Sequence, residues 1–545
     1  MLVVLASWSC PKPAISGDLN CSKGLCKQQP QQVEIKLENR NEWGRDDELY
    51  VKLRSKKKLN WKKTKLFAGD HLASQTICPE SLLTKSDDKC FKIFLSALPD
   101  LPHGDYQLKF KARLVYARGR PKYHTQSFNI RISRLLWSIN ERFWHVPGVT
   151  TREGLLVLML NEFDEDIWKR FLVAVNSHGE TVWKTEMPQI DNISMLGNHR
   201  GLDVVLVGCY LPGGSNGHQA VNARTGEVLS GDCSTSTRLN DTDLTLLQGG
   251  PDKDLVVLRK VVSQDNNNIH IEACRFTQNK TSNKSWGFDC RQSGTLFPRI
   301  YGLNDRIFVR QTPDGSAKVF IGSFKRYWCT QEWNDKKGWS KGCIEEGPPV
   351  TPSYSRFVFV RLLGSEHILV STGVNLSDEK FHYFDLKTGS KTASFESSRH
   401  PQLVDESDEL IFTKINEIYR LSAAGDVLSS DKIYWGLYWE SMGIMEGGNL
   451  VLPILGPNVM CLKPDMKACW EGSYGYDSEA KLLGVLPMSP TRSIVVYTSS
   501  RGIFGSLFDS SGLKKDAPWP IMGHDLCRTF NASVPIDNCW DGPRH

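Results

Sequence analysis

The stretch Phe171-Leu-Val-Ala-Val-Asn-Ser-His-Gly-Glu-Thr-Val-Trp183 decides how this chain folds. Apolar residues lead into a polar turn, and a β-branched and aromatic run leads out of it. Gly179 is suited to the turn, because glycine takes a positive φ at little steric cost. The pattern predicts a small β-hairpin.

The same unit recurs along the chain, which makes it a repeat. Similar turns occur in Ala-Val-Asn-Ala-Arg-Thr-Gly-Glu-Val-Leu (220–229), in Tyr-Phe-Asp-Leu-Lys-Thr-Gly (383–389) and in Tyr-Arg-Leu-Ser-Ala-Ala-Gly-Asp-Val-Leu (419–428). Further turns are expected at Pro464-Asp465 and at Gly512. Two units deviate, and their hairpins are expected in the longer segments Ile269–Cys290 and Val319–Cys343.

Short apolar runs form a second repeat, and each is followed by one of these hairpins. The runs start 40 to 61 residues apart, at Leu155, Val204, Leu255, Ile307, Ile368, Leu410, Leu450 and Ile494. That period suits a propeller blade of four strands with an apolar inner strand. Eight blades are predicted, with seven as the alternative. A solenoid or a series of sandwiches would leave exposed strand edges, whereas a closed ring protects them.

A different pattern precedes residue 134. Strand-like runs are Val33–Leu37, Leu49–Leu53, Phe91–Leu98, Tyr106–Val115 and Phe128–Ile132. The segment Asp100-Leu-Pro-His-Gly-Asp-Tyr106 resembles the loop and strand entry late in an immunoglobulin-like or macroglobulin-like sandwich, over about 100 residues. The fold class is therefore predicted as all-β, a β-sandwich followed by a β-propeller.

Four segments divide the chain on this basis. A leader and cysteine-containing segment occupies residues 1–30, the β-sandwich 31–133, an aromatic segment between the domains 134–150, and the propeller 151–545. Met1-Leu-Val-Val-Leu-Ala-Ser resembles the apolar core of a signal peptide, with a buried first strand as the alternative. No apolar run approaches the length of a transmembrane helix.

The fifteen cysteines indicate an oxidising compartment. Most fall into close pairs that predict disulfides within hairpins, although spacing alone does not establish connectivity. The predicted pairs are Cys21/Cys26, Cys78/Cys90, Cys209/Cys233, Cys274/Cys290, Cys329/Cys343, Cys461/Cys469 and Cys527/Cys539, which leaves Cys10 unpaired.

Seven N-x-S/T sequons agree with a secreted, extracellular glycoprotein. The candidate glycosylation sites are Asn20, Asn192, Asn240, Asn279, Asn283, Asn375 and Asn531.

Charge is distributed unevenly, with a net +12 over residues 1–135 and −6 over the remainder. The asymmetry suggests a basic docking face or attraction between the two domains. One segment concentrates the cations around a tryptophan: Arg54, Lys56, Lys57, Lys58, Trp61, Lys62, Lys63 and Lys65. These residues are candidates for binding a polyanion such as a sulfated glycan or an acidic membrane surface, although a solvated hairpin tip is the simpler interpretation. Nucleic acid is not expected as a partner of a secreted chain.

The hairpins at 175–183 and 220–229 resemble the A-x-D-x-x-T-G-x-x-x-W repeat of quinoprotein-like β-propellers. Ala517-Pro-Trp-Pro-Ile-Met-Gly-His-Asp-Leu-Cys-Arg-Thr-Phe530 is similar to a P-W-P-x-x-x-H-D-x-x-x-T segment beside such propellers. The resemblance covers roughly residues 150–540 and implies that the turn glycine and the tryptophan dock neighbouring blades. Quinone-dependent dehydrogenases of that superfamily also use adjacent cysteines, which this chain lacks, so no cofactor is expected.

No residue pattern identifies a catalytic site. The pair His524-Asp525 is more simply a packing motif than a general base with its carboxylate. Asp164-Glu-Asp166 and Asp405-Glu-Ser-Asp-Glu409 offer oxygen ligands without calcium-loop spacing, so solvated turns are the simpler interpretation and no metal is expected. Hydrolase, metalloprotease and nucleotide-binding motifs are missing.

The sequence thus favours a non-enzymatic binding or matrix protein whose partner is an extracellular protein or an anionic glycan. The alternative is a secreted enzyme with an axial active site in the propeller, either a hydrolase or a quinone-dependent dehydrogenase. The repeat predicts the fold, and fold does not carry activity.

Overall fold

The computed structural model describes an all-β chain that divides into two compact units, Met1–Ser133 (unit 1) and Arg134–His545 (unit 2). Among the described residues no helix has the length and apolar character needed to cross a membrane. The described residues are 19–22, 25–28, 33–38, 43–44, 48–68, 71–79, 82, 89–95, 104–116, 120–139, 148–164, 167–211, 215–230, 244–262, 268–278, 286–295, 297–298, 307–312, 314, 316–322, 328–346, 357–363, 367–372, 380–396, 403–405, 407–414, 417–422, 424–432, 442–454, 458–467, 469, 481–499, 502–517, 521, 525, 527–528, 534, 536 and 539. The predicted leader therefore lies mostly outside them.

Unit 1 contains two sheets and a separate hairpin. Its strands are β1 (Leu19–Ser22), β2 (Leu25–Gln28), β3 (Val33–Leu37), β4 (Trp43–Gly44), β5 (Glu48–Ser55), β6 (Lys65–Ala68), β7 (His71–Leu72), β8 (Ser74–Thr76), β9 (Lys89–Phe94), β10 (Gly104–Leu114) and β11 (Lys122–Ser133). One sheet has the order β3-β5-β9-β8 and the other β4-β11-β10-β6-β7. Each of the five strand-like runs predicted in this region overlaps a strand, although the end of the run Phe91–Leu98 lies outside the described residues.

A single hydrophobic core joins the two sheets of unit 1. Ile35 and Val51 contribute from the first sheet, and Leu66, Phe110 and Ile130 from the second. Buried and exposed residues alternate along β3 and β10, because successive side chains of a strand point to opposite faces. Each sheet therefore keeps one face for the core and presents the other to solvent.

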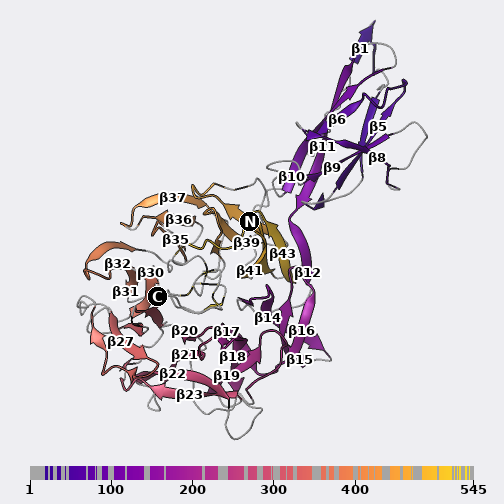
Figure 1. The fold of residues 1–545 in the computed structure, drawn as a ribbon. Helices are drawn as coiled ribbons and strands as arrows, with labels where there is room; N and C mark the ends of the chain where they lie inside the picture. The colour runs from indigo at the N-terminus through magenta and orange to yellow at the C-terminus, as the bar shows by residue number, and fades with distance from the viewer. Residues whose placement is uncertain are drawn as a thin grey trace, which may run out of the picture. The chain divides into compact units, whose positions relative to one another are not determined.

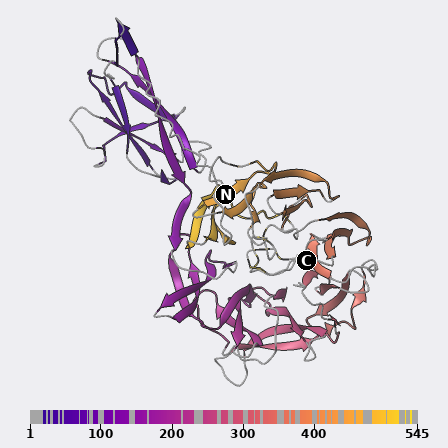
Figure 2. The same ribbon diagram turned by 180° about the vertical axis from the view of Figure 1, so that it is seen from behind.

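Unit 2 is a succession of antiparallel sheets that Figure 1 shows side by side around a ring, seen from behind in Figure 2. The first half of the ring contains β12 (Leu135–Ile139), β13 (Val149–Thr150), β14 (Leu156–Asp164), β15 (Ile167–Val175), β16 (Thr181–Glu186), β17 (Ile190–His199), β18 (Leu202–Leu211), β19 (Ser215–Asn222), β20 (Thr245–Gln248), β21 (Val256–Val262), β22 (Asn268–Gln278), β23 (Trp286–Gln292), β24 (Phe297–Pro298), β25 (Phe308–Gln311), β26 (Ala317–Gly322), β27 (Trp328–Asn334), β28 (Gly338–Trp339) and β29 (Ile344–Glu345).

The second half continues the same arrangement. Its strands are β30 (Phe357–Leu363), β31 (His367–Thr372), β32 (Lys380–Asp385), β33 (Lys391–Glu396), β34 (Leu403–Val404), β35 (Leu410–Lys414), β36 (Glu417–Leu421), β37 (Val427–Lys432), β38 (Gly443–Ile444), β39 (Leu450–Ile454), β40 (Asn458–Leu462), β41 (Lys481–Ser489), β42 (Arg492–Ser499) and β43 (Gly502–Phe508).

The sheets are β12-β43-β42-β41, β13-β14-β15-β16, β17-β18-β19, β20-β21-β22-β23 with β24, β25-β26-β27-β28 with β29, β30-β31-β32-β33, β34-β35-β36-β37 and β38-β39-β40. They give the described part of unit 2 a propeller-like architecture. Since the sheets at β17 and β38 contain three described strands rather than four, the number of blades stays a prediction.

Most of the predicted apolar runs do not form the innermost strands, which corrects the sequence interpretation. Figure 1 shows β20, β21, β22 and β23 in succession from the centre of the ring outward. Seven runs lie at the second strand of their sheet, in β14, β18, β21, β31, β35, β39 and β42, and only the run at Ile307 adjoins a first strand, β25. A second strand is paired along both edges, and neighbouring sheets cover both of its faces. Its residues are therefore apolar in a continuous run and do not alternate between apolar and polar.

The stretch 171–183 forms the outer hairpin that its pattern predicts. Strands β15 and β16 pair in antiparallel fashion, and β15 also pairs with β14, where Leu160 is opposite Phe171. In the turn, Asn176 Oδ1 accepts the N–H groups of His178 (2.9 Å) and Glu180 (3.0 Å), and Gly179 has a φ of 77°. The asparagine and the glycine together fix this turn.

The aromatic segment at 134–150, predicted to lie between the domains, supplies strands to the ring. Strand β12 pairs with the last strand, β43, and the N–H of Leu507 donates to the carbonyl of Arg134 at 2.7 Å. Val149 and Thr150 form β13, the first strand of the next sheet. Among the described residues of this segment, Trp137 is part of the contact between two sheets.

Tryptophans dock neighbouring sheets through the turn glycines. Trp137 Nε1 donates to the carbonyl of Ser177 at 2.9 Å, and Trp183 Nε1 donates to the carbonyl of Ala223 at 3.0 Å. Both rings lie against glycines, since a Cβ added to Gly179 or Gly226 would approach them to 2.6 Å. The docking role predicted for Gly179 and Trp183 is confirmed: Gly179 receives Trp137 from the preceding sheet, and Trp183 reaches the following one.

Substitution of Gly226 by alanine tests this contact. We expect Gly226→Ala to lower the free energy of unfolding by about 2–4 kcal/mol, because it adds a clash with Trp183 to the strain of a positive φ. Trp183→Ala should cost about 3–5 kcal/mol. The measurement is equilibrium denaturation of the purified chain.

Gly389→Ala is the matched control, since Gly389 also has a positive φ, 67°, but nothing lies within 4 Å of an added Cβ. It should cost about 1 kcal/mol, the strain alone. Equal losses for the two glycine variants would show that the tryptophan does not hold the turn.

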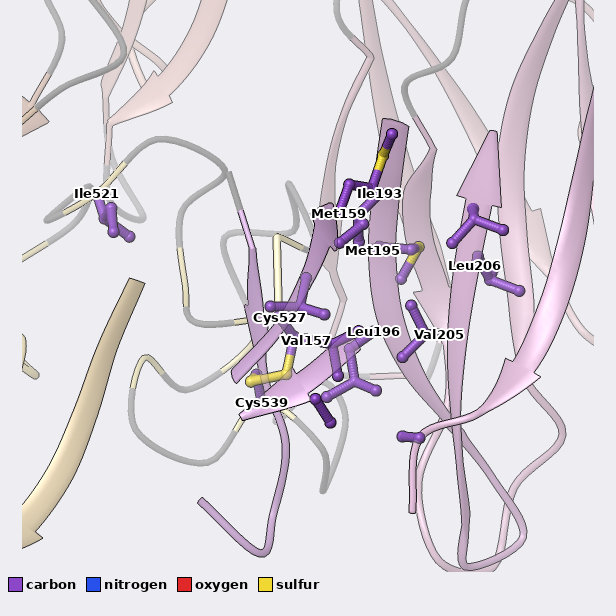
Figure 3. Close-up of a cluster of buried hydrophobic side chains, with 14 of the residues drawn as sticks. Val157, Met159, Ile193, Met195, Leu196, Val205, Leu206, Ile521, Cys527 and Cys539 are labelled. Carbon is purple, nitrogen blue, oxygen red and sulfur yellow. A yellow bond between two sulfur atoms is a disulfide. The ribbon is translucent and has the colours of Figure 1, made fainter. Parts of the chain in front are cut away.

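The segment after β43 returns to the first strands of other sheets. Gly443 of β38 bridges to Ile521, and the Leu196 N–H in β17 donates to the carbonyl of Cys527 at 2.9 Å. Figure 3 shows Cys527 and Cys539 beside Val157 and Leu196 in a shared apolar cluster. The C-terminal segment therefore ties together first strands of sheets that are not neighbours in the ring.

Candidate functional site

The predicted basic segment, residues 54–65, is a connection between the two sheets of unit 1. We call it the basic crossover, because β5 belongs to one sheet and β6 to the other. The interpretation as a hairpin tip is therefore wrong. Leu59 bridges to Tyr116, and the Asn60 N–H donates to the carbonyl of Val115 at 2.7 Å. The Asn60 carbonyl in turn accepts the Thr64 N–H at 2.9 Å, so the crossover has a defined backbone.

The cations of the basic crossover point into solvent while its apolar side chains anchor it. Leu59 is buried in the core of unit 1, and Trp61 is partly buried against that core. The exposed cations are Arg54, Lys56, Lys57, Lys58, Lys62, Lys63 and Lys65. Among the described residues, no acidic side chain forms an ion pair with any of the six lysines. The structure thus concentrates unneutralised charge on an anchored segment.

Strand β10 adds cations that were not assigned from the sequence. Lys109, Lys111 and Arg113 alternate with the buried residues Phe110 and Ala112, so they point away from the core. In the sequence Lys109-Phe-Lys-Ala-Arg113, the alternation of cations with apolar residues is the only pattern that could have identified this row. It points to a row of cations on one face of the strand only once Phe110 and Ala112 are known to face the core.

The described part of the chain contains five of the predicted disulfides. They are Cys78–Cys90, Cys274–Cys290, Cys329–Cys343, Cys461–Cys469 and Cys527–Cys539. Cys209 is also disulfide-bonded, while its predicted partner Cys233 lies outside the described residues. The backbone register of β1 and β2 places Cys21 opposite Cys26. Such local crosslinks are typical of proteins from oxidising compartments.

Only two of the candidate glycosylation sites fall among the described residues. Asn20 lies in β1, and Asn192 is half-buried in β17, where its Oδ1 accepts the Gly208 N–H at 3.2 Å. A glycan requires an exposed acceptor and fits poorly at Asn192. The other candidates, Asn240, Asn279, Asn283, Asn375 and Asn531, lie outside the described residues.

Two groups of side chains in the described part have the proximity of metal ligands, and both contain disulfide sulfurs. They are Glu272 with Cys274 and Cys290, and Asp525 with Cys527 and Cys539. A disulfide sulfur is not the thiolate that binds metal ions. Neither group is therefore suited to a metal ion.

The acidic turn at 405–409 is a buried ion network rather than the solvated turn expected from the sequence. Asp405 is 3% exposed, and Arg420 Nη1 donates to its Oδ2 at 2.6 Å and to Glu409 Oε2 at 2.8 Å. Asp405 Oδ1 accepts the N–H groups of Ser407 (2.9 Å) and Glu409 (3.1 Å). Burial raises the pKa of Asp405 to about 6, against the opposing effect of Arg420. Asp405 and Glu409 are both engaged by Arg420, so they are poor candidates for calcium. In the other acidic group, only the backbone of Asp164 is described, within β14.

The predicted packing motif near the C-terminus is partly described. Asp525 is 1% exposed, and its Oδ1 accepts the Cys527 N–H at 2.8 Å. Arg528 donates from Nη1 to the carbonyl of Ile193 in β17. His524 lies outside the described residues. The Asp525 carboxylate caps its own turn, and the neighbouring Cys527 belongs with Cys539, Val157 and Leu196 to one apolar cluster (Figure 3).

No family model matches the chain, and neither does any curated protein. Two crystal structures of BBS1N in complex with ARL6DN are similar to it. The one soaked with mercury is 14% identical, covers 70% of this chain and 99% of that chain, and has a TM-score of 0.31. The one soaked with lead is 12% identical, covers 59% and 93%, and has a TM-score of 0.32.

A protein of unknown function from Bacteroides caccae is 13% identical over 49% of this chain and 96% of that chain, with a TM-score of 0.24. Likeness at this level carries no argument about what this chain binds.

The buried network at Arg420 gives a testable expectation for stability. Arg420→Met should lower the free energy of unfolding by about 3–5 kcal/mol, because it leaves Asp405 buried without its charge partner. Thermal denaturation at neutral pH measures the loss. Adding Asp405→Asn should recover part of it, since the amide needs no counter-charge.

The control is Lys467→Met, which removes a lysine from an exposed pair with Asp465. That change should cost less than about 1 kcal/mol. If Arg420→Met is as mild as the control, the network contributes little to stability.

Proposed function

We propose that this protein is an extracellular, non-enzymatic binding protein that engages an anionic glycan through unit 1. In this proposal unit 1 is an immunoglobulin-like or macroglobulin-like β-sandwich. Unit 2 is a quinoprotein-like β-propeller that acts as a rigid scaffold. An extracellular protein carrying such a glycan is an equally suitable partner.

The observation that carries the proposal is the anchored basic crossover. Six lysines are exposed on a segment whose backbone is fixed by hydrogen bonds and whose Leu59 is buried. A fixed backbone lowers the entropy lost when the segment binds. Unneutralised cations attract a polyanion without first breaking internal ion pairs.

Two features of the described residues favour an extracellular scaffold over an enzyme with an active site on the propeller axis. The disulfides favour an oxidising compartment. Where the C-terminal segment meets the first strands of the ring, Cys527 and Cys539 lie in an apolar cluster, and the Asp525 carboxylate caps a turn. A hydrolase needs converging carboxylates, and a quinone site needs an open aromatic cavity.

Neutralising the crossover should weaken glycan binding. We expect Lys56→Ala/Lys57→Ala/Lys58→Ala to raise the Kd for heparin, because three exposed charge contacts are lost. At about 0.2–1 kcal/mol each, the loss is roughly 3-fold to 150-fold. Surface plasmon resonance on immobilised heparin measures the Kd, and glycan and extracellular-protein arrays survey other ligands.

The matched control is Lys336→Ala/Lys337→Ala/Lys341→Ala, which removes three exposed lysines from unit 2. It changes the net charge equally but should leave the Kd unchanged. Unchanged binding by the crossover variant, or equal weakening by both variants, would refute the assignment of the site to unit 1.

A further inference from the structure

The outer face of the sheet containing β6, β10 and β11 is basic and continuous with the crossover. Pairing places Arg113 of β10 opposite Lys65 of β6 on one side and Tyr123 of β11 on the other. Lys111 is likewise opposite Phe67 and Thr125. We call Lys65, Phe67, Lys109, Lys111, Arg113 and Tyr123 the cationic face.

An aromatic ring stands within this row of charges. Tyr123 is 62% exposed, and Lys111 Nζ lies 5.0 Å from the centre of its ring. An exposed tyrosine that is not part of the core is a suitable platform for the apolar face of a sugar. The neighbouring lysine provides an ammonium group for an acidic substituent on the same sugar.

The cationic face and the basic crossover meet at one end of unit 1. Val115 and Tyr116, which continue β10, are the residues that hold Asn60 and Leu59 of the crossover. Lys65 ends the crossover and begins β6, so it belongs to both. Arg120, just before β11, and Lys122, its first residue, are exposed as well. The two groups of cations therefore form one surface.

This surface contains little that would repel an anion. Over residues 65–67, 107–113 and 123–129, no outward position holds Asp or Glu. The backbone register places Asp105, further along β10, opposite Arg131. Among the described residues no ion pair involves Lys65, Lys109, Lys111 or Arg113.

The spacing of the charges suits an extended ligand. Alternate residues of a strand are about 7 Å apart, so Lys109, Lys111 and Arg113 form a row about 14 Å long. The crossover prolongs it beyond Arg113. A single phosphate would use one or two of these cations, whereas a chain with repeated acidic groups would use the whole row.

We propose that the cationic face and the basic crossover together bind one linear sulfated polysaccharide, with a sugar ring stacked on Tyr123. The proposal rests on the glycan-binding function of unit 1 and specifies its ligand class and path. A membrane is the less suitable partner, because the disulfides place the chain in an oxidising compartment, whereas anionic lipids populate the cytoplasmic leaflet.

The test uses the full chain with Lys109→Gln/Lys111→Gln, and separately Tyr123→Ser. The ligands are heparin oligosaccharides of increasing length, with affinity measured by titration calorimetry. The double variant should bind long oligosaccharides about 2-fold to 30-fold more weakly, because two charge contacts are lost. It should bind the shortest ones nearly as the unmodified chain does, since those fit on the crossover. Tyr123→Ser removes the stacking contact between the tyrosine ring and the sugar. This contact carries no charge and is not screened by salt, so the loss of affinity should persist at high salt.

Lys336→Gln/Lys337→Gln, in unit 2, is the matched control and should bind every oligosaccharide normally. Unchanged melting temperatures of all variants exclude a folding defect. If the crossover variant weakens binding and the double variant does not, the extended path is wrong while the glycan-binding function stands. If the unmodified chain does not bind heparin, both proposals fail. Binding to phosphatidylserine vesicles with no binding to heparin would assign the surface to membranes instead.

Discussion

The pairing of β12 with β43 is the contact on which the architecture of unit 2 depends. It joins residues more than 350 positions apart and closes the last sheet with a strand from the start of the unit. Without it, β43 would be an open edge able to pair with another chain. Arg134 reinforces the closure, because its Nη2 donates to Asp509 at 2.9 Å beside the paired strands.

Closure also explains why Trp137 lies where it does. The ring of Trp137 lies over Gly505 of β43, where an added Cβ would approach within 2.2 Å, and it reaches Gly179 in the next sheet. One side chain thus links the closing sheet to its neighbour. Trp183 repeats the arrangement at the following contact through Gly226. Hairpins whose outer tryptophan is replaced, as by Leu229, need other contacts between sheets.

Charged residues supply such contacts in unit 2. Asp254, before β21, accepts hydrogen bonds from Arg200 at 2.7 Å and from Arg275 at 3.2 Å, and Arg275 also pairs with Asp335. This chain of charges spans three successive sheets. These carboxylates and guanidinium groups therefore connect neighbouring sheets, whereas the pair of Arg420 with Asp405 lies within the single sheet β34-β35-β36-β37.

Local pattern predicted the fold well because a hairpin is encoded within about a dozen residues. The turn glycines, the strands of unit 1 and the disulfides within hairpins were all readable in this way. Partners distant in sequence were not. The aromatic segment around Trp137 read as a connection between domains, since nothing local shows that β43 completes its sheet. The apolar runs were placed one strand too far inward, because burial alone does not distinguish a first strand from a second.

The candidate site was predictable only in part for the same physical reason. Seven cations around Trp61 form a conspicuous cluster in the sequence. By contrast, Lys109, Lys111 and Arg113 are separated by core residues and do not form such a cluster. Register brings Lys65 beside Arg113 across 48 positions.

The two units use the same residue types in opposite ways. In unit 2, acidic and basic side chains pair across sheets and leave a slightly negative remainder. In unit 1, alternation along the strands directs the cations away from the core, and strand pairing brings them together on one face of the sheet. Few acidic residues lie among them on that face. Exposed lysines that lack an acidic partner repel one another. In the proposal made above, a sulfated ligand would supply the counter-charges that unit 1 does not supply itself.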